Sequence, residues 1–220
     1  MAKLPKPQRM SLDGPAGKLE ALLETPQETT LAGCALICHP HPLHGGTMQN
    51  KVAHTLARSF TGQGFVALRF NFRGVGESAG EFDDGRGEHD DAIAAVQWLR
   101  GHYPELPLWI CGFSFGAAMA IQAAAQCAPA GLVSIAPAVN RVAGTRSQQP
   151  DCPWLIVQGD QDELVDIDRT IAWVNELDPG PELQVFAETE HFFHGKLVLL
   201  REAVGAFVSK QSRPQGCDQP

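Results

Sequence analysis

Short apolar runs and amphipathic segments alternate along most of this chain. Cys34–Cys38 is a fully apolar run bounded by Gly33 and Pro40, which is typical of a strand buried on both faces. The next segment, Lys51–Phe60, has apolar residues at positions 52, 53, 56, 57 and 60, the spacing of a helix with one buried face. Repetition of this alternation predicts an α/β fold, with a mostly parallel central sheet and helices on both of its faces.

The pattern predicts about eight strands in one domain. A turn signal, Asp13-Gly14-Pro15, separates the first two strands, which we expect to form an antiparallel hairpin. No internal repeat or linker divides residues 1–220, and the polar segment 212–220 is expected to fray. The predicted strands are Arg9–Leu12, Lys18–Glu24, Cys34–Cys38, Phe65–Phe70, Leu108–Cys111, Leu132–Ala136, Trp154–Val157 and Leu183–Phe186, and the predicted helices are Lys51–Phe60, Asp90–Arg100, Ala117–Gln126, Ile167–Glu176 and Lys196–Val208.

Composition restricts the classes of protein to which the chain can belong. Of its 220 residues 44% are hydrophobic, and 25 acidic side chains outnumber 17 basic ones, so nucleic acid is not an expected partner. No segment has the ~18 consecutive apolar residues of a membrane span, and the N-terminus has no signal-peptide core. The six cysteines form no C-x-x-C pair, and Cys34 and Cys38 are too far apart along one strand to bridge. Reduced thiols in the cytoplasm are the simplest expectation.

A candidate nucleophile lies where a predicted strand runs into a predicted helix. Gly112-Phe113-Ser114-Phe115-Gly116 fits the pattern G-x-S-x-G, in which a strained turn raises the serine hydroxyl above the edge of the sheet. Small residues on either side let the backbone turn without a clash. The alternative is a glycine-rich strand-to-helix turn without chemistry. The position of the motif between a predicted strand and a predicted helix favours Ser114 as a nucleophile.

A serine nucleophile needs a histidine to accept its proton and a carboxylate to orient that histidine. Candidates for both follow later strands, in the chain order Ser, Asp, His. The segment after the strand Trp154–Val157 carries Asp160, Asp162 and Asp166, and the segment after the strand Leu183–Phe186 carries His191 and His194. Both segments lie at the carboxyl ends of strands, where an open α/β sheet binds its ligand.

The chain resembles the small bacterial α/β-hydrolases related to dienelactone hydrolases and short-chain esterases. The resemblance extends from His39-Pro-His-Pro, through Asn71-Phe-Arg-Gly-Val-Gly-Glu-Ser78 and the serine motif, to Glu190-His-Phe-Phe193. It implies a single α/β-hydrolase domain without a cap. In such proteins the acid is the second Asp of G-x-x-D-x-x-V, which matches Asp162, and the histidine directly precedes Phe-Phe, which matches His191.

An acyl-transfer site also needs backbone N–H groups that stabilise the oxyanion. One donor is expected at Phe115, the residue after the nucleophile, and the second in the loop after the third strand. Pro40 and Pro42 have no N–H and are excluded. By analogy with the His-Gly-x segment of related hydrolases we expect His41 to be the second donor, with Leu43 as the alternative.

The three histidines of this loop, His39, His41 and His44, also raise the possibility of a metal site. A catalytic zinc site usually has an ordered second shell and often a carboxylate ligand, whereas alternating prolines suit a stiff, preformed oxyanion loop. We therefore expect neither a metal nor a cofactor. Arg73-Gly-Val-Gly-Glu-Ser78 fits no phosphate-binding pattern and is interpreted as a structural loop near the site.

The expected substrate is a small soluble ester or thioester. The interval from Ala138 to Pro153 has 16 residues, too few for a helical lid, so we expect an open, shallow site that the excursion Glu81–His89 helps to line. Phe115 and Phe193 are further apolar candidates for its wall. The candidate pocket residues are Leu43, His44, Phe113, Phe192 and His194.

Together these residues predict a serine hydrolase of the carboxylesterase type that works through an acyl-enzyme. A thioesterase or peptidase would use the same groups, and perhydrolysis is also compatible with them. The alternative from a different class is a hydrolase-fold binding module that has lost catalysis. The sequence leaves the natural substrate and the oligomeric state open.

Overall fold

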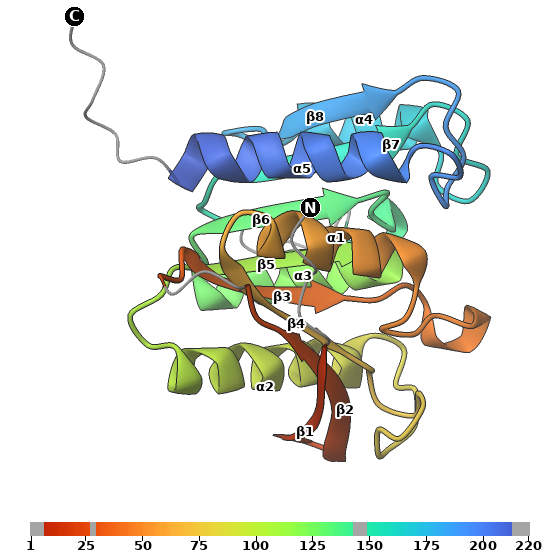
Figure 1. Cartoon of the computed structure of the whole chain (residues 1–220). Coiled ribbons are helices and arrows are strands. Elements are labelled where there is room, and N and C mark those ends of the chain that lie inside the picture. Colours follow the sequence, from red (N-terminus) through yellow and green to blue (C-terminus); the bar gives the residue numbers. More distant parts are fainter. Residues whose placement is uncertain (1–6, 27–29, 143–148, 213–220) are drawn as a thin grey trace, which may run out of the picture.

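The computed structural model describes residues 7–26, 30–142 and 149–212. It has one eight-stranded sheet with the strand order β1-β2-β4-β3-β5-β6-β7-β8 (Figure 1). The strands are β1 (Gln8–Gly14), β2 (Gly17–Glu24), β3 (Gly33–Cys38), β4 (Phe65–Phe70), β5 (Leu108–Phe113), β6 (Gly131–Ile135), β7 (Trp154–Gly159) and β8 (Glu182–Phe186). The hairpin β1–β2 is antiparallel and β2 pairs antiparallel with β4, whereas all strands from β4 to β8 run parallel.

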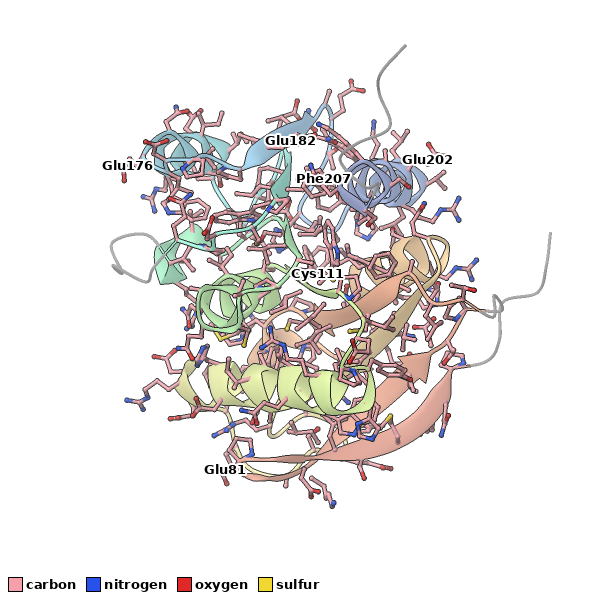
Figure 2. The ribbon with its side chains drawn as sticks, turned by 90° about the vertical axis from the view of Figure 1, so that its left-hand side faces the viewer. Glu81, Cys111, Glu176, Glu182, Glu202 and Phe207 are labelled. Carbon is pink, nitrogen blue, oxygen red and sulfur yellow. The ribbon has the colours of Figure 1, made fainter. Side chains whose placement is uncertain are left out.

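In the described part of the chain, five α-helices cover the two faces of the sheet. One face carries α1 (Lys51–Thr61) and α5 (Leu197–Ser212), and the other carries α2 (Arg86–His102), α3 (Phe115–Cys127) and α4 (Ile167–Asn175) (Figure 1). Figure 2 shows α4 and α5 on opposite flanks of β8, with Glu176 just beyond the end of α4 and Glu202 on α5. Phe207 of α5 points inward and packs against Trp109 of β5. The strands β3, β4, β5, β6 and β7 are therefore buried on both sides, as their apolar sequences predict, whereas the edge strands β1 and β8 are partly exposed.

The predicted fold class is confirmed, but the bounds of all five predicted helices differ from prediction by one to four residues, most at the start of α2 and at the end of α5. α2 begins at Arg86, before the predicted start at Asp90, because Glu88 stabilises an earlier first turn. One Glu88 oxygen accepts the N–H of Gly85 and the other accepts the N–H of Asp83, which satisfies N–H groups that a helix start leaves unpaired. At the other end of the chain, Ser212 is the last residue of α5, so fraying does not begin there; the rest of the predicted frayed tail, residues 213–220, lies outside the described residues.

Parallel strands bring their carboxyl ends to the same edge of the sheet. The loops and turns that follow β3, β4, β5, β6, β7 and β8 leave from this edge. The candidate site residues lie there, with Phe113 as the last residue of β5 and Phe115 as the first residue of α3. Two of these loops contain short 3₁₀ helices, η1 (Pro42–His44) after β3 and η2 (Val139–Arg141) after β6. In the described part of the chain, no helix is long and apolar enough to cross a membrane, and the cysteines there are free; Cys217 lies outside it.

Candidate active site

Ser114 occupies a sharp turn between β5 and α3. Its backbone has φ 57° and ψ −117°, a conformation that is strained for any residue with a Cβ. The turn needs glycine on either side, since a Cβ on Gly112 would lie 2.3 Å from the carbonyl oxygen of Gly116, and one on Gly116 would lie 2.3 Å from the carbonyl oxygen of His39. The result is a half-buried serine hydroxyl at the carboxyl edge of the sheet, next to the positive end of α3.

His191 lies between Ser114 and Asp162. Its Nε2 is 3.0 Å from Ser114 Oγ, and its Nδ1 is 2.8 Å from Asp162 Oδ2. Because an ionised carboxylate can only accept hydrogen bonds, Nδ1 carries the proton, which leaves the lone pair of Nε2 facing the serine. This is the arrangement that a general base needs in order to accept a proton from Oγ.

The Asp162 carboxylate accepts hydrogen bonds on both oxygens. Oδ1 accepts the backbone N–H groups of Leu164 (2.9 Å) and Val165 (2.7 Å), and Oδ2 accepts from His191 and from Gln158 Nε2 at 2.8 Å. Burial alone would raise the pKa of Asp162, but the hydrogen bonds from His191 and the two amides outweigh burial, so the pKa lies below its usual value. Asp162 is therefore ionised at neutral pH.

The other candidate acids and the second histidine make different contacts. Asp160 Oδ1 accepts the N–H of Thr189, and Asp166 caps the start of α4 by accepting the N–H groups of Asp168 and Arg169. His194 is exposed and its Nδ1 lies 3.3 Å from Glu190. Of the candidate acids and histidines, all within the described residues, only Asp162 and His191 are hydrogen-bonded in series with Ser114.

The loop after β3 is anchored by His39. This side chain is fully buried, its Nδ1 lies 2.6 Å from the carbonyl oxygen of Pro40, and its Nε2 accepts the N–H of Phe72 at 3.1 Å. Burial lowers the pKa of His39 to about 4, so the ring is neutral, with the proton on Nδ1. Both ring nitrogens are engaged within the protein, which leaves neither free to ligate a metal.

The two candidate oxyanion donors in this loop differ in their own hydrogen bonds. The N–H of Leu43 donates to His41 Nδ1 at 3.3 Å. The backbone N–H groups of His41 and Phe115 have no partner among the residues that the structure describes. The two residues are neighbours, since their rings lie 4.9 Å apart. The His41 and Phe115 amides are thus free of protein partners within the described residues, whereas the Leu43 amide is not.

The candidate pocket residues fall into an exposed group and a buried group. Leu43 is 67% exposed and Phe192 is 39% exposed, and His44 and His194 are also exposed. Phe113, by contrast, is fully buried, with its ring 4.9 Å from that of His191 and 5.9 Å from that of Phe192. Phe113 therefore supports the His191 ring and does not line an open surface, because its side chain points from β5 into the core. Phe115 and Phe193 are also core residues.

Sequence reasoning missed two residues that contact the site. Gln158 is a polar residue near the end of a fully buried strand, which is a signal of a special role. The predicted strand ends at Val157, which puts Gln158 in the following loop, so this signal was not recognised. Arg141 lies 5.0 Å from the ring centre of Phe115 and forms an ion pair with Asp84 at 3.1 Å. Nothing in the pattern around Arg141 indicates this position, which depends on η2 approaching the loop before α2.

A groove of about 450 Å³ opens between η2 and α4. Two of its lining residues are linked to the triad: Val139 follows Ala138, whose N–H donates to the carbonyl oxygen of Ser114, and the N–H of Val165 donates to Asp162. Trp173 forms part of its wall and Leu164, 65% exposed, lies beside it. The residues that line it are Val139, Asn140, Leu164, Val165, Asp166, Arg169, Ala172, Trp173 and Glu176.

Comparison with known proteins relates most of the chain to serine hydrolases. Residues 41–149 match the family described as serine aminopeptidase, S33. A solved α/β serine hydrolase without a lid from Xanthomonas campestris is 39% identical, with 98% of this chain and 100% of that chain covered and a TM-score of 0.90. An α/β serine hydrolase homologue from Coxiella burnetii is 41% identical over 93% of this chain and 99% of that chain, with a TM-score of 0.87.

One further relative, known from its sequence, is also similar over most of its length. An uncharacterized protein of Rickettsia prowazekii (strain Madrid E) is 34% identical over an alignment of 206 residues, with 89% of this chain and 86% of the relative covered. The similarity thus extends over nearly the whole length of each of these proteins.

Proposed function

The chain belongs to the α/β serine hydrolases, and from that premise we propose that it hydrolyses small carboxylic esters through an acyl-enzyme formed on Ser114. The observation that carries this proposal is the hydrogen-bonded series from Ser114 Oγ through His191 to Asp162. A binding role alone would not need a serine in a strained turn with a neutral imidazole nitrogen 3.0 Å from its hydroxyl.

In the proposed reaction, Ser114 Oγ attacks the ester carbonyl while its proton moves to His191 Nε2. The imidazolium then gives this proton to the departing alcohol, which leaves the acyl group on Oγ. A water molecule attacks the acyl-enzyme, His191 accepts a proton from it, and the same proton returns to Oγ as the acid departs. Asp162 stays ionised throughout and stabilises the imidazolium.

We assign the oxyanion to the backbone N–H groups of Phe115 and His41. Both amides lack a protein partner among the described residues, whereas the Leu43 amide is already bonded to the His41 ring. This difference favours His41 over Leu43 as the second donor. Losing one such donor typically raises the barrier by about 3 kcal/mol.

The substrate is proposed to be a small, soluble acyl ester. The chain between β6 and β7 contains only the short helix η2 in its described part, and Leu43, Phe192 and Leu164 are exposed around the site. We place the part of the substrate that extends past the acid loop in the groove between η2 and α4, whose apolar wall includes Trp173 and Val165.

The proposal is tested by steady-state hydrolysis of p-nitrophenyl esters with acetyl, butyryl and palmitoyl groups, with Ser114→Ala as the control. We expect the short esters to be turned over, with a burst of one nitrophenol per chain, and the variant to be inactive. Palmitoyl turnover far above acetyl and butyryl turnover would refute the choice of small esters. Thioesters and anilides of the best acyl group separate an esterase from a thioesterase or peptidase, and a folded protein inactive on all of them would be a binding module.

A further inference from the structure

Gln158, near the end of β7, donates a hydrogen bond to the candidate acid, Asp162. It is the fifth residue of β7, its side chain is fully buried, and its Nε2 donates to Asp162 Oδ2 at 2.8 Å and to the carbonyl oxygen of Val165 at 3.3 Å. The same Asp162 oxygen accepts from His191 Nδ1 at 2.8 Å. Gln158 therefore shares with His191 the carboxylate oxygen that orients the imidazole.

The orientation of the Gln158 amide follows from its neighbours. Both groups that face Nε2, the Asp162 carboxylate and the Val165 carbonyl, can only accept hydrogen bonds. A flipped amide would place its oxygen against two other oxygens, which is repulsive. Only the NH₂ group fits this position.

This orientation leaves the other half of the amide unpaired. Gln158 Oε1 is buried and has no hydrogen-bond partner among the described residues. A buried carbonyl without a partner is destabilising. Gln158 thus leaves its own Oε1 without a hydrogen bond within the described residues while its Nε2 donates to Asp162. This pattern is expected of a side chain that serves the active site and does not add to the stability of the core.

We propose that Gln158 is a positioning residue of the triad, one that fixes the rotation of the Asp162 carboxylate and keeps it ionised while His191 exchanges protons. The inference rests on the proposed function, because it assigns Gln158 a part in the same reaction. Two backbone amides hold Oδ1 and Gln158 holds Oδ2, so the carboxylate is fixed at both ends and its Oδ2 points at His191.

The dependence of activity on pH distinguishes a positioning role of Gln158 from a purely structural one. A hydrogen bond to the charged form of an acid lowers its pKa. Removing the Gln158 donor therefore raises the pKa of Asp162, and the carboxylate is lost at a higher pH as the solution is acidified. A residue that merely filled the core would change stability and leave the pH profile where it was.

The experiment compares two nearly isosteric variants on the best short ester. In Gln158→Met the donor is gone, and we expect kcat to fall by on the order of tenfold, KM to change less than kcat, and the acidic limb of kcat/KM to move to higher pH. In Gln158→Glu a protonated carboxyl can still donate at low pH, but its ionisation at higher pH sets two carboxylates against each other. Its activity should therefore fall on the alkaline side, and its optimum should move to lower pH.

A matched control lies in the neighbouring strand. Ser134 is a fully buried polar residue of β6 that accepts a hydrogen bond from Trp154 Nε1 at 3.0 Å, and its side chain has no hydrogen bond to a triad residue within the described residues. We expect Ser134→Ala to lower the unfolding midpoint with an unchanged pH profile. If both Gln158 variants behave like Ser134→Ala, the inference is overturned while the proposed function stands; if the wild-type chain has no hydrolytic activity, the proposed function itself fails.

Discussion

At the level of single residues, the hydrogen-bond donors around Asp162 determine how its carboxylate acts on His191. Its Oδ1 is held by two backbone N–H groups and its Oδ2 faces two side-chain donors. In Asp162→Asn the new amide oxygen must face the backbone donors, so its NH₂ group faces His191 Nδ1 and forces the ring into the other tautomer. Nε2 then carries a proton and cannot accept one from Ser114.

We accordingly expect Asp162→Asn to lower kcat by on the order of ten thousandfold with little change in KM. Steady-state kinetics on a short ester checks this. Asp160→Asn is the matched control, since Asp160 binds the N–H of Thr189 and not the histidine, and it should stay within a few-fold of wild type. An Asp162→Asn variant within tenfold of wild type would contradict the assigned role.

Some of the individual site residues can be predicted from the sequence, and others cannot. The serine motif and the order Ser, Asp, His can be read from the residues, because each lies directly after a predicted strand. The choice of Asp162 over Asp160 and Asp166 came from the family resemblance, since all three are acidic residues of one loop. The second oxyanion donor depends on which amides are already paired, and this is a property of the folded loop.

Among the structural elements, the loop after β4 is tied to α2 by a charged pair. Arg73 donates to Asp91 from Nε at 3.0 Å, from Nη2 at 2.8 Å and from its backbone N–H at 2.9 Å. Asp91 is fully buried, and the pairing raises the pKa of Arg73. The predicted structural loop Arg73–Ser78 is thus held by an ion pair that the motif alone does not reveal.

Asp91→Leu should destabilise the fold by about 3 kcal/mol, because it leaves a largely buried guanidinium without its partner. Urea unfolding monitored by circular dichroism measures this change. The neighbouring Asp90, whose side chain is 64% exposed, supplies the control, and Asp90→Asn should change stability by less than about 0.5 kcal/mol. Equal effects at both positions would be inconsistent with a buried pair.

The boundaries of elements were less predictable than their existence. Apolar spacing located α2, but its first turn depends on Glu88 accepting two backbone N–H groups, and Glu88 interrupts the apolar pattern. The position of β4 between β2 and β3 is also a long-range pairing that no local pattern specifies.

In the molecule as a whole, the buried His39 couples stability to pH. Its pKa is lowered by burial from 6.5 to about 4, so the unfolded chain binds a proton at this histidine at a higher pH than the folded protein does. The stability that neutral His39 contributes is complete above about pH 6.5 and is lost as the pH falls toward 4. The loss amounts to about 3 kcal/mol over that window.

We therefore expect the free energy of unfolding to decrease between pH 6.5 and pH 4, and the decrease to be smaller in His39→Gln, which retains one donor and one acceptor. Urea titrations at a series of pH values measure this slope. The exposed His102 provides a control, and His102→Gln should keep the wild-type slope. An unchanged slope in His39→Gln would show that other groups determine the acid sensitivity.

Covalent labelling of Ser114 tests the central claim most directly. The protein and its Ser114→Ala variant are each incubated with a fluorophosphonate, and their intact masses are measured. An activated serine predicts one adduct on the wild-type chain and none on the variant. A wild-type chain that is folded by circular dichroism yet remains unlabelled, or a variant labelled to the same extent, would contradict the account.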